Sequence, residues 1–102
     1  MLPKQVRIGG VPYEVKTTDE PIVVNRRECT AAIHYEQGFI EISADMSPER
    51  QIQALWHEVM HGIVRDRFHG LEIEDEENVV EAFACGVHAF CVDNGLSFPE
   101  RR

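Results

Sequence analysis

The sequence predicts an α+β domain in which a β-rich part, residues 1–46, precedes two long helices at 47–69 and 74–95. Two observations support this prediction. Short apolar segments separated by glycine and proline fill the first half, and apolar residues recur at spacings of three and four in the second. Because 102 residues support only one core, we expect a single domain with its helices on one face of a small antiparallel sheet.

The first two strands are expected on either side of a glycine pair. Val6–Ile8 and Val11–Val15 flank Gly9 and Gly10, the residue type that a tight hairpin turn requires. Pro12 lacks a backbone donor, so it fits an edge position or the start of the second strand.

A second hairpin is expected after a loop. Residues 17–29 are polar and contain a proline, which predicts a loop with at most a short extended piece at Ile22–Val24. Thr30–Tyr35 and Phe39–Ser43 then form the hairpin. The alternation of isoleucine with Glu41 in its second strand is typical of a half-buried strand.

The first helix has clear start and stop signals. Ser47 is a good N-cap, Pro48 suits the first helical position, and the helix should run to about Phe68 and end before Gly70. Its apolar positions are Ile52, Leu55, Trp56, Val59, Met60 and Ile63.

The second helix should begin within Glu74–Glu77 and end near Asn94, with Gly95 as the stop. We expect residues 96–102 to be a frayed tail. The predicted apolar face of this helix comprises Val79, Val80, Phe83, Ala84, Val87, Phe90 and Cys91.

The first helix contains the segment His57-Glu58-Val59-Met60-His61, an H-E-x-x-H motif. Histidines four residues apart lie one turn apart on one helix face, so both rings can bind a single ion. The carboxylate of Glu58 leaves the helix beside that ion, which suits a general base for a water activated by the metal. The two histidines flank the apolar stripe of the helix, which favours a metal site over a solvated pair.

A catalytic zinc usually has three protein ligands and an open position. A helical wheel of the second helix places Glu76 and Glu77 at or beside its apolar face, whereas Glu81 and His88 point farther away. We therefore favour Glu77 as third ligand, then Glu76, then Glu81. The downstream candidates considered are His69, Asp75, Glu76, Glu77, Glu81 and His88.

Three further residues have weaker claims. His69 lies near the end of the first helix and suits interaction with the helix dipole better than metal binding. His34 lies in a predicted strand and could polarise a substrate carbonyl beside the cleft, and Tyr35 is a similar candidate.

The net charge of −8 argues against general nucleic-acid binding and weakly favours a basic or neutral substrate segment. Much of the acid lies in Glu72–Glu77, which is interpreted as a solvated lead into the second helix. No apolar run approaches the twenty residues of a membrane span, and no signal peptide is evident, so a cytoplasmic location is expected.

Cys29, Cys85 and Cys91 are odd in number and lack C-x-x-C spacing. The pattern is therefore typical of small core residues in a reduced protein, and it argues against a disulfide framework or a cysteine zinc site.

The chain resembles the ImmA/IrrE-type metallopeptidase family, in particular its short phage and prophage members. The specific part of the resemblance is the motif within Leu55–Gly62. The flanking segments that contribute are Gly10–Val15, Phe39–Ile42, Glu77–Ala84 and Asp93-Asn94.

This resemblance implies a zincin-like fold and a zinc-dependent peptidase, with an extended strand near the motif helix that can pair with a peptide. It implies that His57 and His61 bind zinc, that Glu58 is the catalytic glutamate, and that an acidic residue of the next helix, best matched by Glu77, is the third ligand. The expected substrate is a protein or peptide, for example a phage or host repressor. The chain is short for the family and shows no DNA-binding or sensor segment.

Three functional hypotheses remain distinct at this point. The first is a zinc metallopeptidase. The second is a zinc-binding phage accessory protein without catalytic activity, which binds a partner through an exposed sheet edge. The third is a structural domain in which His57 and His61 flank the core and bind no metal.

Overall fold

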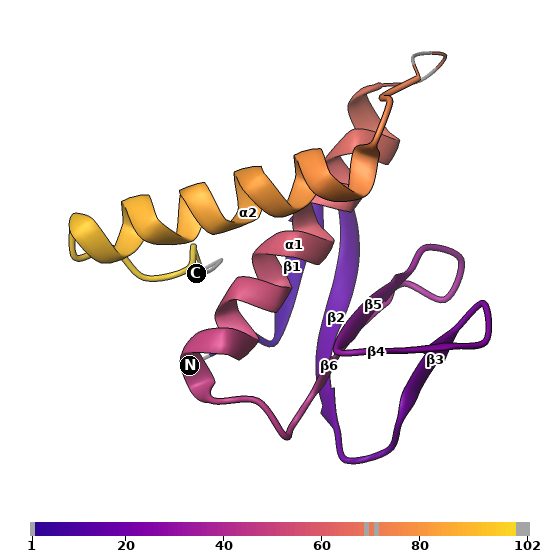
Figure 1. Cartoon of the computed structure of the whole chain (residues 1–102), viewed down its shortest axis with the longest axis horizontal. Coiled ribbons are helices and arrows are strands. Elements are labelled where there is room, and N and C mark those ends of the chain that lie inside the picture. The colour runs from indigo at the N-terminus through magenta and orange to yellow at the C-terminus, as the bar shows by residue number, and fades with distance from the viewer. Residues whose placement is uncertain (1, 69, 71, 100–102) are drawn as a thin grey trace.

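The computed structural model describes residues 2–68, 70 and 72–99, which form an α+β domain with a mixed sheet and two helices (Figure 1). The strand order in the four-stranded sheet is β1-β2-β6-β5, and β3 and β4 form a separate pair. The strands are β1 (Gln5–Ile8), β2 (Val11–Thr18), β3 (Ile22–Val24), β4 (Arg27–Cys29), β5 (Ala31–His34) and β6 (Phe39–Ser43). The helices are α1 (Pro48–Arg67) and α2 (Glu76–Asp93).

The first hairpin forms as predicted, because Gly9 and Gly10 both adopt positive φ (57° and 83°) between β1 and β2. Pro12 is the second residue of β2 and pairs with Arg7, ahead of the stretch from Glu14 onward that also pairs with β6. Its missing N–H therefore costs the sheet little.

The prediction of a purely antiparallel sheet is wrong at one pairing. β2 pairs with β6 in parallel, from Glu14 opposite Phe39 to Thr18 opposite Ser43. The β3–β4 pair and β5 intervene between the two strands in the sequence, so β6 returns in the direction of β2 while remaining antiparallel to β5. Neighbouring strands in this sheet are thus not all neighbours in sequence.

The loop predicted for residues 17–29 is only partly correct. Thr17 and Thr18 extend β2, and Arg27–Cys29 forms β4, which pairs with β3 from Val24 opposite Arg27 to Ile22 opposite Cys29. Asn25 and Arg26 both adopt positive φ (52° and 66°), the geometry of a two-residue hairpin turn. An arginine in such a turn gives no sequence signal, which explains why the hairpin was missed.

Helix α1 matches its prediction closely. Ser47 Oγ accepts a hydrogen bond from the Arg50 amide at 3.3 Å, Pro48 is the first helical residue, and Phe68 is the C-cap. One side of α1 packs on β1, β5 and β6. Gly62 allows this close approach, because a Cβ there would lie 2.6 Å from Cδ1 of Ile8.

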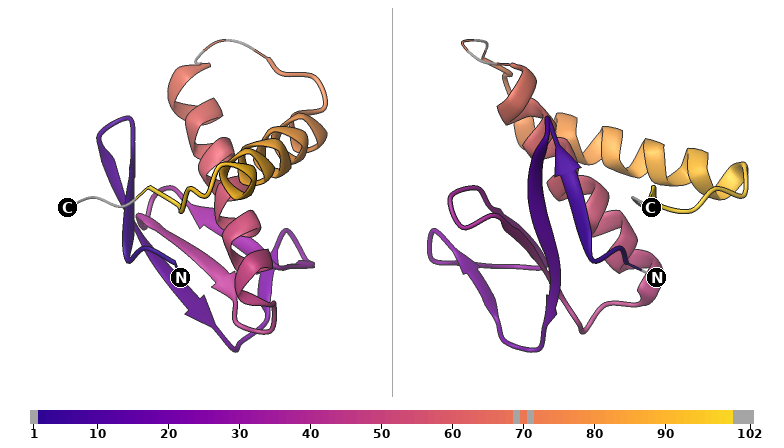
Figure 2. Two further views of the ribbon diagram at one scale, coloured as in Figure 1. Left: turned by 90° about the vertical axis from the view of Figure 1, so that its left-hand side faces the viewer. Right: turned by 180° about the vertical axis from the view of Figure 1, so that it is seen from behind.

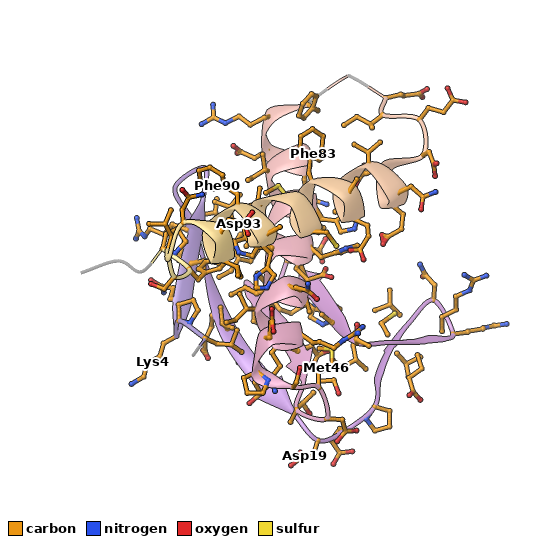
Figure 3. The ribbon with its side chains drawn as sticks, turned by 60° about the vertical axis from the view of Figure 1, so that its left-hand side comes forward. Lys4, Asp19, Met46, Phe83, Phe90 and Asp93 are labelled. Atoms are coloured by element: carbon orange, nitrogen blue, oxygen red, sulfur yellow. The ribbon has the colours of Figure 1, made fainter. Side chains whose placement is uncertain are left out.

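The prediction that both helices lie on the sheet is wrong for α2. This helix crosses α1 on the side away from the sheet, so α1 lies between the two (Figure 2). Its buried residues are Val80, Ala84 and His88, whereas Phe83 and Phe90, labelled in Figure 3, are 64% and 60% exposed.

The buried face of α2 is therefore rotated from the predicted face. It centres on Ala84 and not on Val87, a difference of about 60° at 3.6 residues per turn. The cause is that, among the described helices and strands, α2 packs mainly on α1, so part of its broad apolar face stays uncovered. This rotation turns Glu77, Glu81 and His88 toward α1.

The expectation of a frayed tail is wrong for Phe98. Its ring lies 4.3 Å from the ring of Trp56 and is 9% exposed, so the segment after α2 closes the core beside α1. The central core side chains, all fully buried, are Ile40, Ile42 and Leu55. Within the described residues, neither helix combines the length and apolar character needed to cross a bilayer.

Candidate metal centre

Two helices bring the predicted site residues together. His57 and His61 project from α1, and Glu77, in the first turn of α2, reaches across to them. Glu77 Oε2 lies 2.8 Å from His57 Nε2, and Glu77 Oε1 lies 2.8 Å from His61 Nε2. The favoured three residues thus converge, with one ligand atom from each within 4.8 Å of the others.

The donor set fits a tetrahedral zinc ion. Two nitrogens bound to one tetrahedral zinc at about 2.05 Å lie about 3.3 Å apart. His57 Nε2 and His61 Nε2 are separated by 3.2 Å. Two imidazoles and one carboxylate leave a fourth position, which is the ligand count of a catalytic zinc site and not of a closed structural one.

The other two glutamates considered as ligands contact the opposite nitrogens of the rings. Glu81 Oε1 lies 2.7 Å from His57 Nδ1, and Glu76 Oε2 lies 2.8 Å from His61 Nδ1. In a metal-bound ring that carries one proton, such a contact places the proton on Nδ1, which donates to the carboxylate, and leaves Nε2 as the ligand atom. Glu76 and Glu81 therefore orient the rings, and Glu77 faces the ligand atoms.

Glu58 is buried beneath this cluster, with 8% of the residue exposed. Burial raises the pKa of its carboxyl above the usual value, whereas the charges of His57 and His61 lower it. The backbone amide of Ile33 in β5 also holds the carboxylate form by hydrogen bonding. The prediction placed Glu58 beside the histidines, and the structure adds its contact with the sheet.

The pKa of His61 is also shifted. Burial lowers this pKa, but the carboxylates of Glu76 and Glu77 outweigh the effect through their hydrogen bonds, and the result is a pKa above the usual value. The ring thus sits in a strongly negative environment, which suits a bound cation.

The cluster opens into a cleft of about 800 Å³ between α1, α2, β5 and the β3–β4 hairpin. Strand β5 is at the edge of the sheet and lines this cleft with Ala31, Ala32 and Ile33. The Ser43 amide donates to the Thr30 carbonyl, so these two residues form a hydrogen-bonded pair of the β5–β6 ladder. In an antiparallel ladder such pairs alternate with pairs that are not hydrogen-bonded to each other. Ala31 and Ile33 therefore direct their backbone N–H and C=O groups away from β6.

Several other candidates lie outside the cluster. His34 Nε2 lies 2.8 Å from Glu41 Oε1, and the His34 ring stacks on Phe39. These residues are on the sheet face opposite the buried isoleucines of β6, which pack under α1. The structure therefore does not bring His34 to the cleft. Asp75 accepts hydrogen bonds from Asn78 at 2.8 and 3.0 Å. His69 lies outside the described residues.

Two predictions from the second helix need correction. His88 was expected to point away from α1, but it is 6% exposed and its Nε2 lies 3.3 Å from Glu49 Oε1 of that helix. Cys85 was expected in the core but is exposed and lines the cleft. Partial desolvation and the neighbouring Glu81 carboxylate raise the pKa of this thiol, which disfavours a nucleophilic role.

Tyr35, a weaker candidate in the sequence, lies near the site. The charges of Glu58 and Glu76 contribute to raising the pKa of its hydroxyl, after burial, and Arg65 Cζ lies 4.1 Å from the ring centroid. Sequence reasoning missed two residues that line the cleft, Arg27 and Arg50. The available signal was that Arg50 precedes His57 by seven residues, two turns of the same helix.

A scan against protein-family models, a search of curated proteins and a search of solved structures found no match to this chain.

Proposed function

We propose that this chain is a zinc-dependent metallopeptidase with a zincin-like arrangement of motif helix, sheet edge and following helix. The observation that supports this most directly is the convergence of His57 Nε2, His61 Nε2 and the Glu77 carboxylate around one point in an open cleft. Glu58, a buried carboxylate, lines the same cleft.

The three ligands have distinct roles in the proposal. His57 and His61 are held by the rigid backbone of α1, and their ring orientation is fixed by Glu81 and Glu76. Glu77 supplies a negatively charged oxygen ligand, a donor type that zinc also binds. A bound zinc ion would supply Lewis acidity and lower the pKa of a water molecule to about 7.

Glu58 is the proposed general base. A carboxyl with a raised pKa holds a proton more readily once it has accepted one from the attacking water, and it can then deliver that proton to the leaving amine. The Ile33 amide donates to the Glu58 carboxylate, and Glu58 lines the cleft with the two histidines. Its burial also limits exchange of the proton with bulk water.

The proposed substrate is an extended segment of a protein or peptide. The free edge of β5 presents the N–H and C=O groups of Ala31 and the C=O of Ile33 to the cleft. An added strand would hydrogen-bond to these groups and pass directly beside Glu58. Pairing through the backbone accepts many side-chain sequences, so selectivity must come from the walls of the cleft.

The proposal is tested by combining zinc analysis with a cleavage assay. Wild type, Glu58→Gln and His57→Ala are loaded with zinc, dialysed, analysed for metal and incubated with a diverse peptide mixture read by mass spectrometry. We expect one zinc per chain in wild type and Glu58→Gln, and none in His57→Ala. We expect hydrolysis by wild type, at least about 100-fold less by Glu58→Gln, and none by His57→Ala.

The controls separate the alternatives. A chelator must abolish cleavage and added zinc must restore it, which excludes a contaminating serine or cysteine peptidase. Zinc binding without cleavage by wild type would favour the non-catalytic accessory protein. Absence of zinc from wild type would refute the metal centre itself.

A further inference from the structure

One side of α2 is an apolar surface that no described segment of the chain covers. Phe83 and Phe90 are 64% and 60% exposed, and they are seven positions, about two helical turns, apart, so both rings project from the same side of the helix (Figure 3). A continuous exposed apolar surface of this kind usually marks an interaction site. We call this surface the outer face of α2; it consists of Val79, Ala82, Phe83, Gly86, Val87 and Phe90.

A groove of about 290 Å³ lies on the outer face. The residues that line it are all apolar: Ala82, Phe83, Gly86, Val87 and Phe90. Gly86 lies between the two phenylalanines in sequence, and a Cβ at this position would meet no atom within 4 Å. The groove is therefore open at Gly86, and its volume exceeds the roughly 150 Å³ that accommodates a benzene ring.

The charges of α2 are directed mainly toward α1. Glu76, Glu77 and Glu81 contact the rings of His57 and His61, so these carboxylates belong to the metal centre. The helix contains no lysine or arginine, whereas a helix that lies on a membrane surface usually carries these residues beside its apolar face. The outer face therefore suits an apolar protein surface better than a lipid surface.

The outer face is complementary to a second copy of itself. Each copy offers an apolar groove and two projecting rings, so a ring of one copy can occupy the groove of the other. In an antiparallel two-fold contact centred near Gly86, Phe83 of one copy lies beside Phe90 of the partner subunit. This direction also keeps the acidic first turns of the two helices at opposite ends of the contact, which limits repulsion in a chain with a net charge of −8.

The area of the outer face indicates how strong such a contact would be. Phe83 and Phe90 together expose about 250 Å², taking about 200 Å² for each fully exposed side chain. The rest of the outer face brings the area to roughly 450 Å² per copy, or about 900 Å² in total, below the about 1,200 Å² of most stable complexes. The contact therefore fits a reversible dimer that dissociates at low micromolar concentration.

We propose that the outer face of α2 is a homodimer interface, in which the α2 helices of two copies pack antiparallel about a two-fold axis near Gly86. Glu77 and Glu81 contact α1 on the other side of the helix, so the dimer leaves the cleft of each copy open. The inference does not depend on the proposed peptidase function, because it uses neither the metal nor the cleft.

Sedimentation velocity over a range of concentrations measures the association directly. Wild type is examined from about 5 to about 500 µM with a reducing agent, because Cys85 is exposed and would otherwise form intermolecular disulfides. Each series is run with and without a chelator, which detects association through bridging metal ions. We expect a monomer at the lowest concentration and a dimer at the highest, with a Kd on the order of 100 µM in both series.

Gly86→Gln is the variant that tests the interface. The added side chain has room in the monomer, and glutamine favours a helix more than glycine does, so the fold should be retained. The same side chain fills the groove with a polar group, and we expect association at least about tenfold weaker. Val92→Ser is the matched control, because Val92 is an exposed apolar residue of the same helix, about 200° around its axis from Phe90. It should dimerise like wild type.

The outcomes distinguish this interface from other forms of association. Loss of the dimer in Gly86→Gln but not in Val92→Ser supports the proposal. A dimer that persists in Gly86→Gln, disappears equally in Val92→Ser or requires metal overturns it, and so does a wild type that stays monomeric at every concentration. If that monomer co-sediments with phosphatidylcholine vesicles, the outer face binds lipid instead.

Discussion

Glu81 Oε1 lies 2.7 Å from Nδ1 of His57, on the side of the ring opposite the Nε2 atom that faces Glu77. Glu76 contacts Nδ1 of His61 in the same way at 2.8 Å. Each histidine is thus held between two carboxylates of α2, one toward each ring nitrogen. In the proposed site, Glu77 is therefore the ligand, and Glu76 and Glu81 are positioning residues.

We predict that Glu81→Gln and Glu76→Gln each weaken zinc affinity by about 10- to 100-fold without abolishing binding, because a neutral amide fixes the ring tautomer less well. Glu77→Ala should have the larger effect, since it removes a ligand. Competition with a chromophoric chelator measures all three. Glu74→Gln is the matched control, because this exposed carboxylate of the same acidic segment contacts neither histidine. An equal loss in Glu74→Gln would mean that bulk negative charge, not ring orientation, governs affinity.

Metal removal should also change stability. A ligand that binds only the folded state at a thousand times its Kd stabilises it by about 4 kcal/mol, which for a domain of about 100 residues raises Tm by on the order of 15 °C. We predict a rise of this size when zinc is added to wild type and to Glu58→Gln.

His57→Ala separates specific binding from general effects of zinc on that Tm. The variant lacks one ligand but keeps the rest of the acidic surface, so its Tm should be nearly independent of zinc. If zinc raised the Tm of His57→Ala as much as that of wild type, the stabilising site would lie elsewhere.

Much of this site follows from local sequence, because the helix spacing fixes where His57 and His61 project. The Ser47 cap fixes where that helix begins in the same way. Local sequence favours Glu77 over its neighbours but does not single it out, because its role depends on how α2 is rotated about its own axis. That rotation is set by tertiary packing on α1, which the wheel of an isolated helix does not contain.

The same limit explains the misplacement of Glu81 and His88. The prediction counted Phe83 and Phe90 in the apolar face, yet both are exposed, because no described segment covers that side of α2. The parallel pairing of β2 with β6 was missed for a related reason. It joins strands that are distant in sequence, and the order of apolar and polar residues within a strand does not indicate which strand it pairs with.

The contact of Phe98 with Trp56 yields a stability prediction. Phe98→Ala removes a 9%-exposed ring from the core and should cost about 2–3 kcal/mol in the free energy of unfolding. Phe90→Ala removes the same side chain from a position that is 60% exposed and should change stability by less than about 0.5 kcal/mol. Urea denaturation followed by Trp56 fluorescence measures both. Equal effects would mean that the segment after α2 does not dock in solution.

Tyr35 gives a prediction for alkaline pH. Burial, with added repulsion from Glu58, raises the pKa of its hydroxyl from 10.0 to about 12. The folded state therefore favours the neutral phenol. Its contribution to stability is fully present below pH 10 and is lost as pH rises through about 12. We expect the urea midpoint to fall more steeply over this interval in wild type than in Tyr35→Phe, which has no proton to lose at this position. Absorbance of tyrosinate provides the second measurement, because the component that titrates near 12 should disappear in Tyr35→Phe. An unchanged slope together with a retained late component would assign the effect to another group.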